Sequence, residues 1–329
     1  MAMTRTAATI LVTGAAGFIG SHLCEALIAR GERVIGVDNL DTFYDVRLKS
    51  SNIASVEKVS RGRPGAFEFV RADICDAEAM DAMLARVKPA GIVHLAAKAG
   101  VRPSIADPIG YTRANLLGTS VLLEYAKRAG VSRFVMASSS SVYGNNPKTP
   151  FAEDDDVSGP VSPYAATKRS CELLAHAHWH LTRMPTACLR FFTVFGPRQR
   201  PDLAIGQFMR LISRDEEVPM YGDGESSRDY TFVADVVRGV ISAYDRVDRF
   251  GYRVWNLGGS SPVPLREMIA TIARTVGREA RVKPLPMQPG DVERTWADLT
   301  RSALELDYQP QTAFVDGVAL QWAWMKQGG

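Results

Sequence analysis

The sequence is poor in several features that mark specialised classes of protein. Its four cysteines, Cys24, Cys75, Cys171 and Cys188, are too far apart for the spacing of metal-ligand or redox pairs. No apolar run reaches the length that crosses a bilayer. The first residues enter an apolar strand without the charged and then apolar pattern of a signal peptide. These absences predict a cytoplasmic protein with reduced thiols and no metal site.

An excess of charge of either sign is also missing. The chain has 39 basic and 36 acidic residues, so its formal net charge is only +3. This value is too small to predict a nucleic-acid or membrane surface. With 329 residues, 46% of them hydrophobic, the chain is long enough to bury a large core and to form two lobes.

The first half of the chain alternates short apolar strands with helical patterns. This alternation predicts parallel strands joined by right-handed crossovers, and therefore an α/β fold with a doubly wound, Rossmann-type sheet. Long helices are expected at Asn115–Ala129 and Tyr164–Leu181. The expected strands are Thr9–Val12, Val34–Val37, Phe67–Arg71, Gly91–Leu95, Phe134–Ser138 and Ala187–Phe191.

The composition of the sequence changes after Gly196, where proline, glycine and charged residues become more frequent. We predict a Rossmann domain over residues 1–195, to which a segment near 230–248 returns, and a smaller α/β lobe over residues 196–329. Ligands of such folds bind at the carboxyl ends of the strands, which this lobe would cover. Its expected elements are Val218–Tyr221, Val254–Leu257, Val282–Pro284, Leu265–Val276 and Phe314–Lys326.

A glycine-rich turn joins the first strand to the first helix. Glycine permits a tight turn and lets the backbone approach a pyrophosphate, which the amides of a helix N-terminus attract. The spacing is GxxGxxG rather than the more common GxGxxG, but it lies between a strand and a helix, as a dinucleotide site requires. The residues expected to bind the cofactor here are Gly14, Ala16, Gly17, Phe18, Ile19 and Gly20.

The ends of the next strands carry residues suited to the rest of a dinucleotide. Asp38 ends the second strand, where its carboxylate can accept hydrogen bonds from both ribose hydroxyls and would repel a 2′-phosphate. This favours NAD over NADP, and we discount Arg47 and Lys49 because they lie well past the strand end. The other expected cofactor contacts are Asn39, Asp73, Ile74, Leu95, Ala96, Ala97 and Asn115.

Candidate catalytic groups follow in order along the chain. Tyr164 and Lys168 are four residues apart in a predicted helix and so share one face. An ammonium group and the positive charge of oxidised nicotinamide stabilise a phenolate, which can then act as a base toward a substrate hydroxyl. A run of serines, Ser138–Ser141, follows an apolar strand, which places hydroxyl groups at the ligand edge of the sheet.

The ordered set GAAGFIG, Asp38, HLAAKAG, SSSSVYG, SPYAATK and RDY resembles the extended short-chain dehydrogenases/reductases, and the nucleotide-sugar 4-epimerases in particular. The resemblance covers nearly the whole chain. It implies that Ser139, Tyr164 and Lys168 are catalytic, and that Tyr164 and Lys168 also contact NAD. It further implies a homodimer through a four-helix interface built from the two long helices.

Three segments are similar to UDP-glucuronate 4-epimerases, namely DNLDTFYD, AGVRPS and RFFTVFGPRQRPD. By this resemblance Thr193 and Arg200 contact the sugar carboxylate, Arg228 the diphosphate and Asp291 the uridine ribose. A guanidinium fork suits a carboxylate, and a hydroxyl group completes the contact. The full set of expected substrate residues is Arg102, Ser139, Ser140, Ser141, Thr193, Arg200, Tyr221, Arg228 and Asp291.

The expected reaction is NAD-dependent epimerisation of UDP-glucuronate to UDP-galacturonate through a 4-keto sugar. Ser140 and Ser141 stand where 4,6-dehydratases carry an acid/base pair, which argues against dehydration. Lys98 replaces an expected glutamine, and its role is open. Thr295 stands where glucose/galactose epimerases carry a bulky tyrosine, and a small residue there could admit an N-acetyl group, so UDP-N-acetylglucosamine remains an alternative substrate. UDP-glucose is a further alternative. A non-catalytic nucleotide sensor on the same fold is a more remote alternative.

Overall fold

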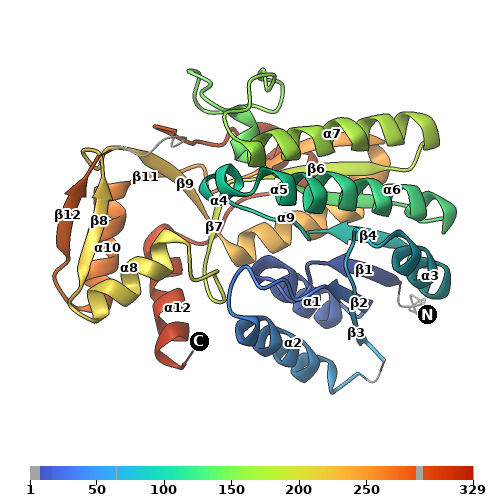
Figure 1. Ribbon diagram of the computed structural model, residues 1–329, viewed down its shortest axis with the longest axis horizontal. Helices are drawn as coiled ribbons and strands as arrows, with labels where there is room; N and C mark the ends of the chain where they lie inside the picture. The colour runs from blue at the N-terminus through green and yellow to red at the C-terminus, as the bar shows by residue number, and fades with distance from the viewer. Residues whose placement is uncertain (1–7, 64, 287–291, 329) are drawn as a thin grey trace. The chain divides into compact units, whose positions relative to one another are not determined.

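The structure is a computed structural model that describes residues 8–63, 65–286 and 292–328 (Figure 1). The chain forms two compact units. The first unit comprises Met1–Ser138, Pro163–Leu189 and Val240–Val254. The second unit comprises Ser139–Ser162, Arg190–Gly239 and Trp255–Gly329.

This division differs from the predicted boundary after residue 195. The chain enters the second unit at the carboxyl ends of two strands, so that 139–162 and 190–195 group with the later residues. The returning segment is Val240–Val254 rather than residues 230–248. Which unit binds NAD and which binds the nucleotide sugar remains a prediction.

A seven-stranded sheet forms the centre of the fold, and its doubly wound arrangement confirms the predicted Rossmann-type fold class. The pairings of β1 with β2 and β4, of β2 with β3, and of β4 with β5 are all parallel. The strands in spatial order are β10 (Tyr252–Leu257), β6 (Thr186–Phe191), β5 (Phe134–Ser139), β4 (Gly91–His94), β1 (Thr9–Thr13), β2 (Arg33–Asp38) and β3 (Phe67–Arg71).

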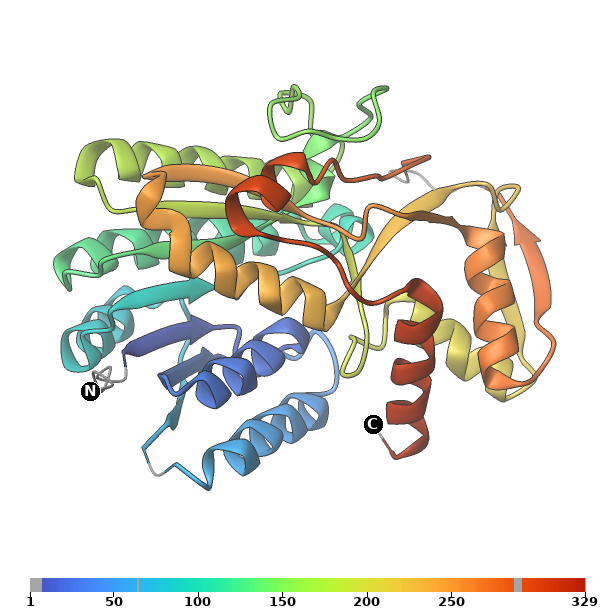
Figure 2. The same cartoon turned by 180° about the vertical axis from the view of Figure 1, so that it is seen from behind.

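Helices cover both faces of this sheet in the first unit, which defines the doubly wound α/β fold. Helices α1 (Phe18–Arg30) and α2 (Val46–Ser60) lie on one face (Figure 2). Helices α3 (Ala77–Val87), α6 (Gly118–Arg128) and α7 (Pro163–Thr182) lie on the other (Figure 1). The core between the sheet and this second group of helices includes Leu11, Ile35, Leu84, Leu122 and Phe134.

The elements between β4 and α6 are shorter and less regular. They are α4 (Val101–Ala106), α5 (Pro108–Tyr111) and the π-helical turn η1 (Thr112–Leu117). The helix expected from Asn115 to Ala129 therefore begins as a π-helix and continues as α6. Since π-helical turns are rare and often occur at functional sites, η1 is a candidate part of the functional site.

The second unit contains two small sheets. The first has the order β11 (Pro262–Pro264), β9 (Ser227–Phe232), β7 (Thr193–Phe195), and the second pairs β12 (Arg281–Leu285) with β8 (Glu217–Tyr221) in parallel. The expected strand Val254–Leu257 lies instead in β10 of the seven-stranded sheet. The helices are α8 (Ala204–Ser213), α10 (Leu265–Val276), α11 (Thr300–Leu306), α12 (Phe314–Lys326) and the part of α9 (Val233–Arg246) that precedes Val240.

No helix in the described part of the chain combines the length and the apolar character needed to cross a membrane. Among the described residues there is also no group of three or more histidine, cysteine or acidic side chains arranged to hold a metal ion.

Candidate active site

The glycine turn lies at the point where the strand order of the sheet reverses. β1 is flanked by β2 on one side and β4 on the other, and ligands of doubly wound sheets bind outside the carboxyl ends at such a point. Gly14 has a φ of +71°, and a Cβ atom there would lie only 2.8 Å from the backbone nitrogen of Ala96. Only glycine therefore permits this close approach between the turn after β1 and the chain after β4.

Helix α1 begins directly after this turn. Gly17 is the N-cap residue of this helix. Within the described part of the chain, no side chain caps the first backbone amides of α1. A Cβ atom on Gly20 would collide with the carbonyl of Gly14, so the helix and the turn pack backbone against backbone. The first amides of α1 are thus arranged to receive an anion such as a pyrophosphate.

Asp38, at the end of β2, is buried beside the turn. Its carboxylate accepts hydrogen bonds from the backbone N–H of Ala16 at 3.2 Å and of Leu40 at 2.8 Å. Burial raises the pKa of Asp38, and the ammonium group of Lys49, 3.9 Å away, opposes this shift. The prediction that Lys49 lies too far past the strand end to matter is wrong on this point, because α2 folds back and buries Lys49 beside Asp38.

The other residues expected to contact the adenosine half lie where the third strand ends or just after Asp38. Asn39 is exposed, and its side chain accepts the backbone N–H of Asp41. Asp73 accepts the backbone N–H of Cys75 at 2.9 Å. Ile74 is buried in the core, where it packs on the α-carbon of Gly118. Their contact with a cofactor stays a prediction.

Asn115 connects the chain after β4 to helix α7. Its side-chain oxygen accepts the backbone N–H of Lys98 at 2.8 Å. Its side-chain nitrogen donates to the carbonyl of Lys98 and to the hydroxyl of Thr167, both at 3.0 Å. Asn115 is 1% exposed in the π-helical turn η1, so this residue fixes the segment that carries Leu95, Ala96 and Ala97.

The open role of Lys98 has a structural answer. Its ammonium group forms an ion pair with Asp107 at 2.7 Å. Asp107 also accepts the backbone N–H of Gly110 at the start of α5. The pair closes the loop that contains the expected substrate residue Arg102, which lies exposed on the short helix α4.

Tyr164 and Lys168 lie one turn apart on the buried face of α7. The backbone N–H of Tyr164 donates to the hydroxyl of Ser104 at 3.1 Å, and the Tyr164 ring packs edge to face on Tyr111. The ammonium group of Lys168 donates to the carbonyl of Ala137 at 2.8 Å. The predicted catalytic helix is thus held directly against the last residues of β5.

Sequence reasoning missed a third residue on this face, Glu172. It is fully buried, and its carboxylate accepts the hydroxyl of Ser138 at 2.6 Å and pairs with Arg169 at 3.0 Å. Glu172 follows Lys168 by four residues, so the same helical spacing that paired Tyr164 with Lys168 could have revealed it. Two consecutive residues of β5 are therefore bound to α7 by side-chain hydrogen bonds.

The serine run continues into the second unit as a 3₁₀ turn, η2 (Ser140–Tyr143). Ser139 follows Ser138 directly and has extended backbone geometry. Its hydroxyl accepts the backbone N–H of Ser141 and donates to the Ser141 hydroxyl, both at 3.1 Å. The hydroxyl groups of Ser139 and Ser141 thus form one connected set at the end of β5.

The segment from Thr193 to Arg200 is held by hydrogen bonds of two side-chain amides, those of Gln199 and Gln321. Gln321 on α12 accepts the backbone N–H of Gly196 at 3.0 Å and donates to the side chain of Gln199 at 2.8 Å. Gln199 in turn donates to the carbonyl of Val194 at 3.1 Å. Thr193 itself starts β7 and is paired with Tyr230 of β9.

The guanidinium group of Arg200 forms two hydrogen bonds with a neighbouring carboxylate. Its Nε and NH2 groups donate to the two oxygens of Asp202 at 3.0 and 2.7 Å. The Arg200 side chain is only 16% exposed. This bidentate geometry is the one that an arginine would use to hold a carboxylate of a ligand.

The remaining predicted substrate residues lie on strands of the second unit or near them. Arg228, on β9, donates to the carbonyl of Ser227 at 3.0 Å, and Tyr221 ends β8. Thr295 is buried, and its hydroxyl accepts the backbone N–H of Asp229 at 3.1 Å. Asp291 lies outside the described residues.

The glycine turn at the switch point, the acidic end of β2 and the tyrosine–lysine pair on α7 define a class. They are the features of a Rossmann-fold protein of the short-chain dehydrogenase/reductase type. The sequence model of the GDP-mannose 4,6 dehydratase family matches residues 11–321, and the chain belongs to that family.

Relatives cover nearly the entire chain. A probable UDP-glucuronate 4-epimerase of Rhizobium meliloti is 39% identical over 96% of both chains. A UDP-glucuronate 4-epimerase of Thermodesulfobacterium geofontis is 38% identical, also over 96% of both. A solved UDP-glucuronic acid 4-epimerase from Bacillus cereus, in complex with UDP-glucuronic acid and NAD, superposes with a TM-score of 0.89 at 35% identity, covering 98% of this chain and 100% of that one.

Proposed function

We propose that the protein is an NAD-dependent UDP-glucuronate 4-epimerase, which interconverts UDP-glucuronate and UDP-galacturonate. The observation that carries the proposal is that Tyr164 and Lys168 lie one turn apart on the buried face of α7, where Lys168 donates to the carbonyl of Ala137 in β5, just before the serine turn. The names of the relatives and the ligands of the Bacillus cereus structure support the substrate and the cofactor.

The residues of the first unit fit NAD. The amides at the start of α1 would hold the pyrophosphate, and the backbone at Gly14 leaves no room for a side chain. The buried carboxylate of Asp38 would accept the hydroxyl groups of the adenosine ribose and would repel a 2′-phosphate. When bound, NAD would supply the nicotinamide that accepts a hydride from carbon 4 of the sugar and returns it.

The proton steps belong to side chains of this protein. Tyr164 removes the proton of the 4-hydroxyl group, and the ammonium group of Lys168 stabilises the phenolate form. Ser139 donates a hydrogen bond to the reacting oxygen and relays its proton. Turnover of the 4-keto sugar within the site would present its other face, so that Tyr164 would return the proton to a 4-hydroxyl group of the opposite configuration.

Thr193 and Arg200 would hold the sugar carboxylate. The 4-keto form of glucuronate is a β-keto acid, which loses carbon dioxide when the carboxylate bond aligns with the carbonyl π system. Holding the carboxylate out of this alignment suppresses the loss. Since Arg200 is paired with Asp202, the substrate carboxylate would replace or share this partner.

The family takes its name from a dehydratase, but the serine turn argues for epimerisation in this chain. Removal of a proton from carbon 5 requires a base, and the residues at the relevant positions are Ser140 and Ser141. A hydroxyl group without a partner base cannot perform this step at neutral pH. Oxidation followed by reduction at carbon 4 is the reaction left to these residues.

An isotope experiment tests the reaction type. UDP-glucuronate carrying deuterium at carbon 4 is incubated with the purified enzyme without added cofactor, and the products are followed by NMR. The proposal predicts UDP-galacturonate that keeps the deuterium, because the hydride returns within the site. Release of carbon dioxide with a UDP-pentose, or loss of water, would assign a different reaction.

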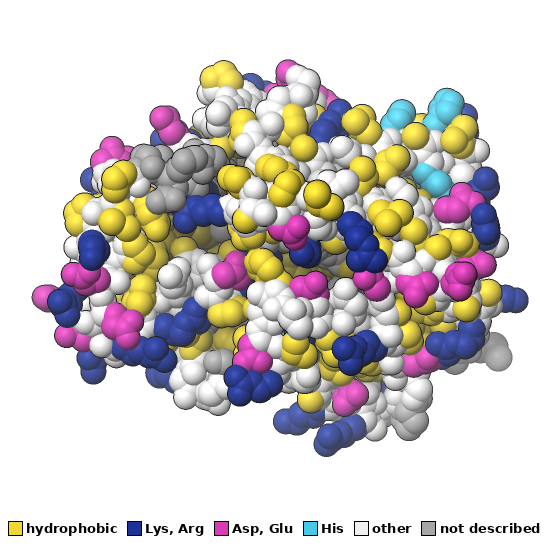
Figure 3. Space-filling model, in the orientation of Figure 1, with side chains coloured by type: hydrophobic (Ala, Val, Ile, Leu, Met, Phe, Trp, Pro, Cys, Tyr) yellow, Lys and Arg dark blue, Asp and Glu magenta, His cyan; other side chains and the backbone are white. Residues whose placement is uncertain are grey.

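We also propose a homodimer through α6 and α7. Leu117, Leu173 and Leu181 are 47%, 54% and 81% exposed on η1 and α7, although such residues are usually buried. Figure 3 shows apolar side chains on this face of the molecule. Sedimentation equilibrium should give a dimer mass, whereas a monomer mass at all concentrations would exclude the dimer. A cytoplasmic location stays a prediction.

A further inference from the structure

Tyr143 ends the turn that carries the serine hydroxyls. The turn begins after Ser139, and its backbone closes when the N–H of Gly144 donates to the carbonyl of Ser141 at 3.2 Å. Tyr143 is 3% exposed. Its ring stacks on Phe151 with a centroid distance of 4.8 Å, within an apolar cluster that also contains Phe192. The ring therefore anchors one end of the turn in the interior of the second unit.

The hydroxyl group of Tyr143 is hydrogen-bonded to a side chain of β10. It donates to the side-chain oxygen of Asn256, on β10, at 2.7 Å. The side-chain nitrogen of Asn256 donates to the carbonyls of Phe151 at 2.8 Å and of Asp298 at 3.1 Å. These bonds fix which end of the Asn256 amide faces Tyr143, because only the nitrogen can donate to two carbonyls.

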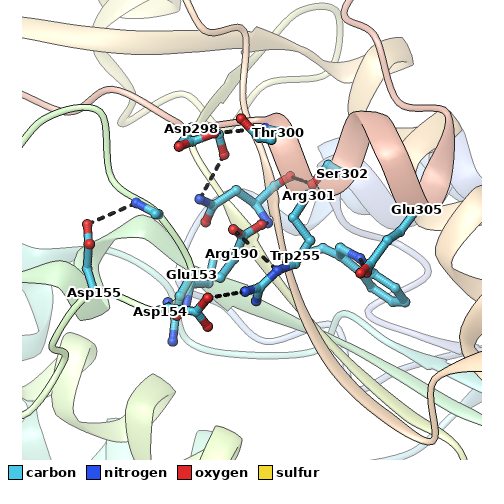
Figure 4. Close-up of polar contacts among 12 residues, drawn as sticks. Glu153, Asp154, Asp155, Arg190, Trp255, Asp298, Thr300, Arg301, Ser302 and Glu305 are labelled. Carbon is cyan, nitrogen blue, oxygen red and sulfur yellow. Dashed lines mark hydrogen bonds and ion pairs between the residues drawn. The ribbon is translucent and has the colours of Figure 1, made fainter.

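Two buried charged residues complete the network. The guanidinium of Arg190 lies 4.8 Å from the centre of the Tyr143 ring and donates to the carbonyl of Glu153 at 3.1 Å. The carboxylate of Glu153 accepts the backbone N–H of Asn256 at 2.8 Å and lies 3.9 Å from Arg301. Figure 4 shows Glu153, Arg190 and Arg301, which come from the loop after η2, from β6 and from α11.

Buried charges cost stability unless they are paired, and their replacement by apolar residues is often neutral or stabilising. Their presence around Tyr143 is therefore poorly explained by stability alone. A network of this kind holds one arrangement of the segments that it joins, and the segment at its edge is the serine turn. A proton relay needs such precision, since small misplacements of a catalytic group lower the rate.

We propose that Tyr143, held by Asn256 and Arg190, is a positioning residue that sets the orientation of Ser139 and of the turn after it, which carries Ser141. The inference rests on the proposed function, because Ser139 acts as a relay only if the protein oxidises a sugar hydroxyl. Tyr143 itself takes no part in the chemistry.

The variant Tyr143→Phe keeps the ring and its stacking but removes the hydrogen bond to Asn256. A matched control is Tyr308→Phe. Tyr308 is 4% exposed in the same unit, and its hydroxyl donates to the carbonyl of Gly258 at 3.0 Å. Both substitutions remove one buried, hydrogen-bonded tyrosine hydroxyl and keep the ring. A purely structural role for Tyr143 predicts the same kinetic result for both variants.

Loss of one such hydrogen bond corresponds to a change of about tenfold in a rate constant, or in the equilibrium constant for opening of the serine turn. We expect Tyr143→Phe to lower kcat about tenfold with the KM of the sugar nucleotide changed less than twofold. Tyr308→Phe should leave both values near those of the wild type. Equal kcat values for the two variants would overturn the proposal.

A second measurement does not depend on the substrate. Amide hydrogen exchange of Ser141 and Gly144 reports opening of the turn, because both amides are hydrogen-bonded within it. We expect exchange about tenfold faster in Tyr143→Phe and unchanged in Tyr308→Phe. Unchanged exchange in Tyr143→Phe would contradict the proposal. If the wild type uses another nucleotide sugar, the kinetic comparison is made on that sugar, so an error in the proposed substrate is distinguished from an error here.

Discussion

Arg200 holds the carboxylate of Asp202 with both Nε and NH2, at 3.0 and 2.7 Å. This is the geometry proposed for its contact with the substrate, realised within the protein itself. The segment that carries Arg200 is further fixed by the bonds of Gln321 to Gly196 and Gln199. The guanidinium is therefore already oriented for a carboxylate before a ligand binds.

Replacement of Arg200 by alanine tests this contact. A charge-assisted carboxylate contact contributes about 1.5–3 kcal/mol, roughly 10- to 150-fold in kcat/KM. Arg200→Ala should lose this factor on UDP-glucuronate and far less on any UDP-glucose turnover. It should also release some carbon dioxide, since the carboxylate is no longer held. Equal losses on both sugars would show that Arg200 does not recognise the carboxylate.

The partner of Arg200 gives the opposite prediction. In Asp202→Asn the guanidinium keeps a neutral acceptor but loses the carboxylate that competes with the substrate. We expect the KM for UDP-glucuronate to fall several-fold, with kcat little changed, in steady-state kinetics. A raised KM would indicate instead that Asp202 is needed to orient Arg200.

Tyr164→Phe removes the proposed base without removing the ring that packs on Tyr111. Loss of a general base lowers rates by roughly 10²- to 10⁴-fold, so kcat should fall by this factor while the NAD content is unchanged. Tyr111→Phe is the control, because it removes a neighbouring tyrosine hydroxyl, which donates to the carbonyl of Ala99, and leaves Tyr164 in place. Similar rates for the two variants would remove Tyr164 from the mechanism.

The neighbourhood of Asp38 predicts a pH effect on NAD binding. The ionised carboxylate binds the ribose, so affinity should fall as the pH drops through the pKa of Asp38. Lys49 opposes the burial that raises this pKa. Lys49→Met should therefore raise the pKa further and move the loss of NAD to higher pH.

Arg47→Met is the matched control for this experiment, because the Arg47 side chain is 91% exposed and pairs with Asp45. Retained NAD is measured after dialysis over a pH series. Identical release profiles for Lys49→Met and the wild type would refute the role given to Lys49.

Local patterns in the sequence predicted much of this structure. The ends of α10 and α12 agree with the predicted ranges Leu265–Val276 and Phe314–Lys326, because apolar periodicity along a helix is a local property. The glycine turn could be placed for the same reason, since its strand and helix are its immediate neighbours. The class of fold followed from the order of such elements.

The missing information concerns contacts between segments far apart in the chain. Lys49 was discounted because its return to Asp38 depends on how α2 packs. Helical spacing alone could have marked Glu172 as a residue of this face, but not its bond to Ser138, which is 34 residues away. The bond from Tyr143 to Asn256 spans 113 residues and has no local pattern. Strand β10 was assigned to the wrong sheet for the same reason.

The central claim is the identity of the substrate, and a comparison of UDP-sugars tests it most directly. The purified protein, without added cofactor, is supplied separately with UDP-glucuronate, UDP-glucose and UDP-N-acetylglucosamine, and initial rates are measured by chromatography. We predict the highest kcat/KM for UDP-glucuronate, by roughly tenfold or more, with UDP-galacturonate as the product. A higher kcat/KM for either neutral sugar would contradict the account.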